Sequence, residues 1–325
     1  MYKRITIEEV ARLANVSTAT VSRALNDSPA VRESTKQKIV SIAQSLESQR
    51  SPSPKSSKIL LASFPELTNP FYSDIFRGIL DSAGNRGYEV LFYSMRDYSL
   101  PESYSFFFEN RFYAGLMISH ALPNAQIQQK LQELVPVVKI SEYSDDDPAY
   151  VATDNFKAAY TAVQFLIAAG RQRIALINSS LRNNYALRRE AAYRACLADN
   201  ARAVNEDWVV HLTDINYGAC LDAASRLLRQ EERPDAIFCV SDVYAAAATK
   251  AAAGLGLNVP RDVAVVGFDN VDMSIVTTPA ITTIAQPAFQ LGAQACSMLI
   301  DRIEYPSTPP RRVLLDGELI LRGTT

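Results

Sequence analysis

Short polar and basic side chains are concentrated between residues 17 and 26 of this 325-residue chain. An arginine guanidinium can donate two parallel hydrogen bonds to the major-groove edge of guanine, and a small apolar side chain can contact the methyl group of thymine. Hydroxyl and amide groups can bind phosphate oxygens, which fixes a protein's position on the duplex. We assign base contacts to Thr18, Ala19 and Arg23, and phosphate contacts to Ser17, Thr20, Ser22 and Asn26. The segment therefore predicts contacts with double-stranded DNA.

Three short helices are expected to position these side chains. Thr6 and Glu9 have the spacing of a capping box, which predicts the start of a first helix. A short turn at 14–16 leads to a second helix over 17–25, and a third helix is expected over 33–46 because its apolar residues follow helical spacing. This order predicts a helix-turn-helix, whose second helix enters the major groove.

The charge of the chain is unevenly distributed. The formal net charge is −2, but residues 1–58 contain ten Lys or Arg and five Asp or Glu, so the remainder has a net charge of −7. This asymmetry is typical of a polyanion-binding segment attached to a neutral or acidic body. Residues 48–58 contain five serines, two prolines and no apolar side chain, which predicts a linker.

From residue 59 onwards, short apolar runs alternate with helical patterns. Strands buried on both faces of a parallel sheet are expected at 59–64, 88–93, 114–118, 135–140, 173–177, 235–240 and 263–267. Helices are expected at 71–86, 101–110, 124–134, 154–169, 185–199, 217–230 and 241–253. This alternation predicts doubly wound α/β units, and there is more of it than one sheet usually takes. We therefore expect two lobes, with a ligand-binding cleft at the carboxyl ends of their strands.

Patterns typical of catalysis or metal binding are absent from the sequence. There is no GxSxG elbow, P-loop, HExxH or GxGxxG after a strand. The two histidines, His120 and His211, are isolated, and the four cysteines form no CxxC pair. The acidic run 145–147 is more typical of a solvated loop than of a metal site. An enzyme is therefore the weaker alternative, and we expect no catalytic residues, no metal and no cofactor.

Segments along nearly the whole chain resemble the LacI/GalR family of bacterial transcription repressors. They are NVSTATVSRALN (15–26), VRESTKQKI (31–39), LTNPFYSDIFRGI (67–79), PDAIFCVSDVYAAAA (234–248), VPRDVAVVGFDN (259–270), TPAITTIAQPAFQLGAQA (278–295) and GELILRGTT (317–325). The last two resemble the cytidine-responsive branch most. The resemblance implies an all-α helix-turn-helix headpiece and a two-lobed α/β sensor domain like periplasmic sugar-binding proteins. It also implies a homodimer on operator DNA, controlled by a sugar or nucleoside effector bound between the lobes.

The resemblance carries six residues into the effector site: Phe71, Tyr72, Arg189, Ser241, Asp242 and Asp269. It implies that the two aromatic rings face a ring of the ligand, that Arg189 donates to ligand oxygens, and that Asp269 accepts from hydroxyls or amines. Each residue also has a structural alternative. Asp242 fits a helix cap, Asp269 fits a turn, and Phe71 fits the core.

Two features depart from the family pattern. Where relatives often have a stacking aromatic residue before the helix at 217, this chain has Thr213, which leaves Tyr185 or Tyr217 to replace it. No leucine lies between Leu46 and Leu60, although relatives use a hinge leucine to wedge open the minor groove. We therefore predict a flexible hinge without that wedge, and tolerance of variable spacing between operator half-sites.

The predicted domains are a helix-turn-helix domain at 1–47, a linker at 48–58 and a sensor domain at 59–325, with chain crossings near 153, 285 and 312. These crossings divide lobe 1 (59–153 and 285–312) from lobe 2 (154–284 and 313–325). No apolar run approaches the roughly 18–20 residues of a membrane span. The N-terminus has no secretory pattern, which favours a cytoplasmic regulator without a membrane partner over a second alternative, a periplasmic receptor.

Overall fold

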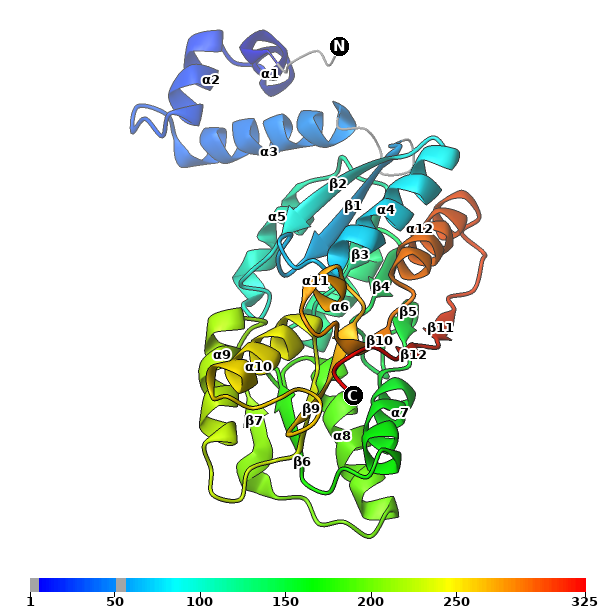
Figure 1. Ribbon diagram of the computed structural model, residues 1–325. Helices are drawn as coiled ribbons and strands as arrows, with labels where there is room; N and C mark the ends of the chain where they lie inside the picture. Colours follow the sequence, from blue (N-terminus) through cyan, green and yellow to red (C-terminus); the bar gives the residue numbers. More distant parts are fainter. Residues whose placement is uncertain (1–5, 51–56) are drawn as a thin grey trace.

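The computed structural model describes residues 6–50 and 57–325, and residues 44–50 by their backbone alone. Figure 1 shows a helical headpiece beside one end of a two-lobed α/β domain. The headpiece consists of α1 (Ile7–Ala14), α2 (Thr18–Leu25) and α3 (Glu33–Arg50). Its small core is formed by Val10, Ala11, Ala14, Val21, Ala24 and Ile39.

Local sequence signals set the ends of the headpiece helices. The Thr6 hydroxyl accepts from the Glu9 amide at 3.4 Å, and the Thr6 amide donates to the Glu9 carboxylate at 3.2 Å, so the predicted capping box is confirmed. Asn15 ends α1 in the left-handed conformation, with φ 58°. That residue turns the chain directly into α2, as a helix-turn-helix requires.

Helix α3 is longer than the sequence suggested. It continues to Arg50 instead of ending near residue 46, because residues 47–50 are Glu, Ser, Gln and Arg, which include good helix formers and no helix breaker. The expected linker therefore overlaps the helix by three residues. The predicted hinge without a leucine wedge falls mainly on residues 51–56, which lie outside the described residues.

Lobe 1 is built on a six-stranded parallel sheet with the order β2-β1-β3-β4-β5-β11. Its strands are β1 (Ile59–Phe64), β2 (Glu89–Ser94), β3 (Gly115–Ile118), β4 (Val137–Ile140), β5 (Tyr150–Thr153) and β11 (Arg312–Leu315). Its helices are α4 (Tyr72–Asn85), α5 (Ser105–Glu109), α6 (Ala125–Leu134) and α12 (Ala288–Glu304), with a 3-10 turn at Pro101–Tyr104 before α5. In register, Ile59 of β1 is opposite Glu89, and Leu60 is opposite Gly115.

Lobe 2 repeats this strand order in a second sheet, β7-β6-β8-β9-β10-β12, in which only β12 is antiparallel to its neighbour. Its strands are β6 (Ile174–Asn178), β7 (Val209–His211), β8 (Ala236–Cys239), β9 (Ala264–Asp269), β10 (Thr282–Ala285) and β12 (Glu318–Ile320). Its helices are α7 (Asn155–Ala168), α8 (Asn184–Asp199), α9 (Tyr217–Leu228), α10 (Asp242–Gly254) and α11 (Met273–Val276), with a 3-10 turn at Glu206–Trp208. Among the described residues, no helix combines the length and apolar character needed to cross a membrane.

The chain crosses between the lobes three times. The first two crossings follow β5 and β10, close to the expected residues 153 and 285. The third lies between Leu315 and Glu318 instead of near 312. Residues 312–315 pair with β5 of lobe 1, and only β12 returns to the lobe 2 sheet, so residues 313–315 belong to lobe 1.

Helices α4 and α12 of lobe 1 pack unusually close, and α12 is absent from the sequence-based expectations. A Cβ atom on Gly78 would lie 2.1 Å from the Phe289 carbonyl oxygen, and one on Gly292 would lie 2.1 Å from the Ile75 carbonyl oxygen. Glycine is therefore required on both sides of this contact. The contact fixes α12, which follows the second crossing, firmly on lobe 1.

Candidate functional site

The exposed face of α2 carries the side chains predicted to contact DNA bases. Val21 and Ala24 are buried against the other headpiece helices. At helical spacing, the opposite face presents Thr18, Ala19, Ser22 and Arg23. Thr18, Ala19 and Arg23 are exposed, and Ser22 is half-buried. The geometry is therefore that of a recognition helix, while the individual base contacts stay predictions.

The other predicted phosphate ligands also shape the ends of α2. The Ser17 hydroxyl accepts from the Thr20 amide at 3.2 Å and shares a 2.8 Å hydrogen bond with the Thr20 hydroxyl. The Asn26 amide donates to the Ser22 carbonyl oxygen at 2.9 Å. These side chains lie at the edges of the recognition face, where they would flank the groove.

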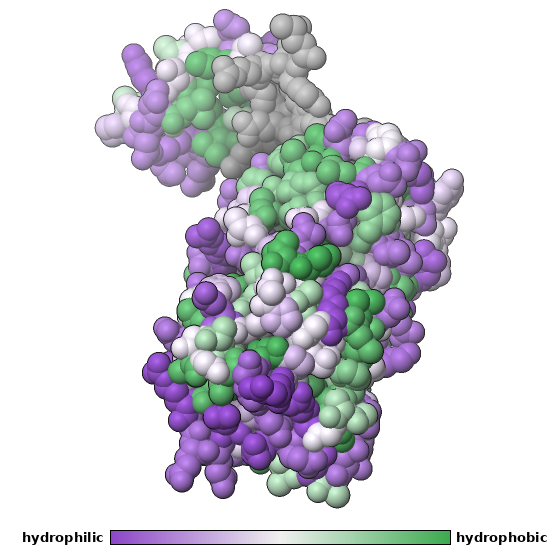
Figure 2. Space-filling view, viewed as in Figure 1, coloured by the Kyte–Doolittle hydropathy of each residue, from purple (hydrophilic) through white to green (hydrophobic). Residues whose placement is uncertain are grey.

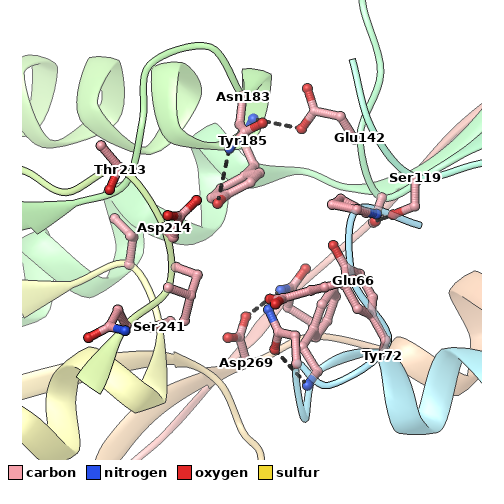
Figure 3. A pocket seen from close by; sticks show the side chains of 18 of the residues that line it. Glu66, Tyr72, Ser119, Glu142, Asn183, Tyr185, Thr213, Asp214, Ser241 and Asp269 are labelled. Carbon is pink, nitrogen blue, oxygen red and sulfur yellow. Dashed lines mark hydrogen bonds between the residues drawn. The ribbon is translucent and has the colours of Figure 1, made fainter. Parts of the chain in front are cut away.

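A cavity of about 510 Å³ lies between the two lobes. Its walls come from the segments that follow β1, β3 and β4 in lobe 1 and β8 and β9 in lobe 2, as expected for ligands at the carboxyl ends of parallel strands. In Figure 3, Tyr185, Asp214 and Ser241 lie on one side of this cavity, opposite Ser119 and Tyr72. Five of the six predicted effector residues line it: Phe71, Tyr72, Arg189, Ser241 and Asp269.

Asp242 does not line the cavity. Its buried carboxylate accepts from the Thr283 hydroxyl at 2.6 Å and from the Val271 amide at 2.9 Å. It lies in the first turn of α10, behind Ser241, whose hydroxyl caps the helix by accepting from the Tyr244 amide. Asp242 is therefore neither a cavity residue nor the cap that the sequence allowed; it fixes the loop after β9, whereas Ser241 both caps α10 and faces the cavity.

Arg189 is held rigidly beside Asp269. Its Nε donates to Asn155 at 2.9 Å and its Nη1 donates to the Val240 carbonyl oxygen at 2.6 Å. The guanidinium carbon lies 3.5 Å from the centre of the Phe268 ring. No hydrogen bond of Nη2 is found within residues 6–50 and 57–325. This nitrogen is the one that remains available to a ligand oxygen.

Asp269 combines the turn role and the ligand-facing role that the sequence left open. Its φ of 113° and that of Asn270 (60°) are positive, so the two residues form a strained turn at the end of β9. One Asp269 oxygen accepts from the Gln286 amide at 2.7 Å. Burial raises the pKa of the Asp269 carboxyl, and the Arg189 charge opposes this rise.

Aromatic side chains from both lobes face the cavity. Phe71, Tyr72 and Tyr98 belong to lobe 1, and Tyr185 belongs to lobe 2. Of the two candidates to replace the aromatic residue missing at Thr213, Tyr185 lines the cavity, as Thr213 itself does. The other candidate, Tyr217, is 40% exposed and lies outside the cavity wall.

Glu142 joins the lobes across the cavity and is a site residue that the sequence analysis missed. It follows β4 of lobe 1, and its two carboxylate oxygens accept from the Asn184 amide at 2.7 Å and the Tyr185 amide at 3.4 Å, at the start of α8 in lobe 2. Tyr98 adds a second bridge, because its hydroxyl donates to the Asn183 side chain at 3.1 Å. Burial raises the pKa of Glu142 to about 7. Its position just after a predicted strand was the available signal.

Comparison with known proteins identifies the family. A family model described as bacterial regulatory proteins of the lacI family matches residues 6–51, and one described as a periplasmic binding protein-like domain matches residues 163–325. The HTH-type transcriptional repressor CytR of Escherichia coli K12 is 32% identical over 98% of this chain and 96% of its own length. The chain belongs to the LacI family of bacterial regulatory proteins.

Three further proteins are similar to this chain. Catabolite control protein A of Priestia megaterium is 30% identical and covers 99% of both chains. The solved complex of the transcriptional regulator CelR with cellobiose superposes with a TM-score of 0.75 at 26% identity, covering 99% of this chain and 100% of that one. An Actinobacillus succinogenes protein has a TM-score of 0.77 at 31% identity, covering 83% of this chain and 99% of its own. The expected fold, a helix-turn-helix headpiece and a periplasmic-binding-protein-like domain, is confirmed, and this LacI-family chain is a DNA-binding transcription regulator.

Proposed function

We propose that this LacI-family chain is a cytoplasmic repressor, without catalytic activity, that binds a pseudopalindromic operator as a homodimer. A sugar or nucleoside in the cavity between the lobes sets its affinity for the operator. The observation that carries this proposal is the pairing, in one chain, of an exposed recognition face on α2 with an enclosed cavity between two lobes.

Base discrimination is assigned to the α2 face. Arg23 has the length and the donors for guanine, and the small Thr18 and Ala19 allow the helix to approach base edges closely. One headpiece buries too little surface for specific affinity, which favours two copies on adjacent half-sites.

The exposed apolar surface of the sensor domain supports the homodimer. Its members are Leu80 on α4, Leu91 on β2, and Ile275 and Val276 on α11, of which Val276 is 77% exposed. The three elements face the viewer in Figure 1, and Figure 2 shows apolar groups gathered over lobe 1 and over the region of α11. Exposed apolar side chains that gather on one face of a molecule are typical of a protein–protein interface.

Closure of the lobes is the proposed link between the two sites. An effector that contacts residues of both lobes, such as Tyr72 and Tyr185, binds the closed arrangement more tightly than an open one. The bridges from Glu142 and Tyr98 to the start of α8 join the lobes in this structure and would stabilise the same closed arrangement. Helix α12 is fixed on lobe 1, next to the end of the sensor domain to which the linker is attached. A movement of one lobe relative to the other can therefore change the distance between the two headpieces of a dimer.

Removal of residues 1–58 tests whether operator binding and effector binding belong to separate parts of the chain. We expect the truncated protein to lose operator binding in a gel-shift assay and to keep the effector affinity of the full chain in calorimetry. The operator is first selected from a randomised duplex library with the full chain. Retained operator binding by the truncated protein would contradict the proposal.

A further inference from the structure

Carboxylates outnumber cations around the cavity between the lobes. The charged residues that line it are Glu66, Glu142, Asp214 and Asp269 against Arg96 and Arg189. Glu142 and Asp269 are the more enclosed of the acids, whereas Asp214 is exposed at the opening. A ligand that enters this cavity therefore meets an excess of negative charge.

The two cations offset the four carboxylates only in part. Arg189 already donates from two of its three nitrogens to Asn155 and Val240, and its charge acts on Asp269. Arg96 is exposed at the edge of the cavity. An anion inside the cavity therefore meets one partly used guanidinium, whereas typical phosphate sites have several converging donors.

Helix N-termini, which commonly bind anions, are also already satisfied here. The first amides of α8 donate to the Glu142 carboxylate. At α10, Ser241 caps the helix and Asp242 occupies its first turn. At α9, the Asn216 side chain accepts from the Ala219 amide at 2.9 Å.

Helix α4 has no side-chain cap, but its first amides are also used. The Tyr72 amide donates to the Asn69 carbonyl oxygen at 3.0 Å, and the Ser73 amide donates to the Pro70 carbonyl oxygen at 3.1 Å. The helices that begin at the cavity wall thus have amides that already donate to oxygens of this chain where a ligand phosphate would otherwise bind.

We propose that the effector carries no phosphate or carboxylate group. It is a neutral or cationic ring compound whose hydroxyl or amino groups donate to Asp269, Asp214 and Glu66, with its ring between Tyr72 and Tyr185. This inference rests on the proposed effector role of the cavity. The phosphate ester of the same compound is rejected because its negative charges would lie among four carboxylates, which the two arginines offset only in part.

The protonation behaviour of the cavity agrees with this selection. Burial raises the pKa of both Glu142 and Asp269, so the site already disfavours negative charge. An anionic ligand would raise these pKa values further, whereas a donating hydroxyl or amine stabilises the ionised carboxylates.

Matched ligand pairs test the proposal on the full-length protein. D-ribose, D-glucose, adenosine and cytidine are each compared with their phosphate esters by isothermal titration calorimetry. For any pair in which binding is detected, we expect the unphosphorylated member to bind at least about 100-fold more tightly, as close like charges require. An ester that binds as tightly as its parent, or more tightly, overturns the proposal, and so does the absence of binding in all four pairs.

Two double variants locate the cause of the selection. Glu66→Gln with Asp214→Asn should reduce the preference against the ester by roughly tenfold or more. Glu133→Gln with Asp222→Asn makes the same change of charge at exposed sites outside the cavity and should leave the preference unchanged. Equal effects of the two double variants would refute an origin in the cavity. A parent compound that binds with the predicted preference but leaves operator affinity unchanged contradicts the proposed function alone.

Discussion

The two binding regions of this LacI-family chain are built in opposite ways. The DNA-facing side chains lie on one eight-residue helix and are mostly exposed, so the fold does not depend on them. The effector cavity is assembled from both lobes, and its inner charged groups Arg189, Glu142 and Asp269 are enclosed and hydrogen-bonded to other parts of the chain. This difference means that the exposed base-reading positions of α2 can vary with little loss of stability, whereas a change at the inner cavity residues alters ligand recognition and folding together.

Arg189→Ala should give the largest effect. It leaves two buried acceptors, Asn155 and the Val240 carbonyl oxygen, without their donor, and it removes the charge that opposes the rise in the pKa of Asp269. At about 1–3 kcal/mol for each unsatisfied acceptor, the unfolding free energy should fall by about 2–6 kcal/mol. Urea denaturation measures the loss, and effector binding should fall with it. The neighbouring Arg188→Ala is the control. Arg188 pairs with Asp145, whose side chain is 84% exposed, so its loss should cost no more than about 1 kcal/mol.

Arg23→Ala should give the converse result. We expect operator binding to weaken by about 1–3 kcal/mol and discrimination to relax at one base pair, with no loss of folding stability. Fluorescence anisotropy with single-base operator variants measures both quantities. Arg77→Ala, an exposed change on α4, serves as the control. An unchanged base preference in the Arg23 variant would remove this residue from the recognition face.

The pH dependence of stability should separate the two regions further. The pKa of Glu142 is raised from 4.5 to about 7 in the folded protein, so the folded state binds this proton more tightly than the unfolded state. Stability from this group is therefore complete below about pH 4.5 and is lost as the pH rises through about 7. Glu142→Gln should make the decline of the unfolding free energy between about pH 4.5 and pH 7 shallower, by at most about 1.4 kcal/mol per pH unit. Parallel curves for the two proteins would contradict the assignment.

Ser17→Ala should have the smallest effect. It removes the cap that accepts from the Thr20 amide, which typically costs about 1 kcal/mol of helix stability. Thermal unfolding of the headpiece, followed by circular dichroism, measures this cost. Ser41→Ala in the middle of α3 is the control, because alanine is favoured at an exposed position inside a helix. If the two variants melt alike, Ser17 is not a functional cap.

The contrast between the regions also explains what could be predicted from sequence. Thr6 and Glu9 act on each other across three positions, so their spacing alone predicted the start of α1, and the spacing of apolar residues predicted α3. The cavity residues Arg189 and Asp269 came from the family resemblance, not from any local pattern. Glu142 was missed because its role depends on a helix of the other lobe.

The missed strands are short and interrupted by polar residues. Strands β5, β7, β10, β11 and β12 have three or four residues, and each contains at least one polar or charged side chain. The equally short β3 and β8 consist of apolar residues and Gly115, so they were recognised.

Helix α12 was also missed, although its buried residues Leu291, Ala295 and Leu299 follow helical spacing. This spacing was the available signal. Its contact with α4, by contrast, joins segments about 200 residues apart and could not be predicted from a local window.

The most direct test of the account is the affinity of the full-length protein for a selected operator as an unphosphorylated effector is added. We predict a strong preference for that operator over random duplex, and a change in its affinity of about 5–150-fold at saturating effector. The same protein with Arg23→Ala should lose much of this preference and still bind the effector. Equal affinity for operator and random duplex, with and without effector, would contradict the account.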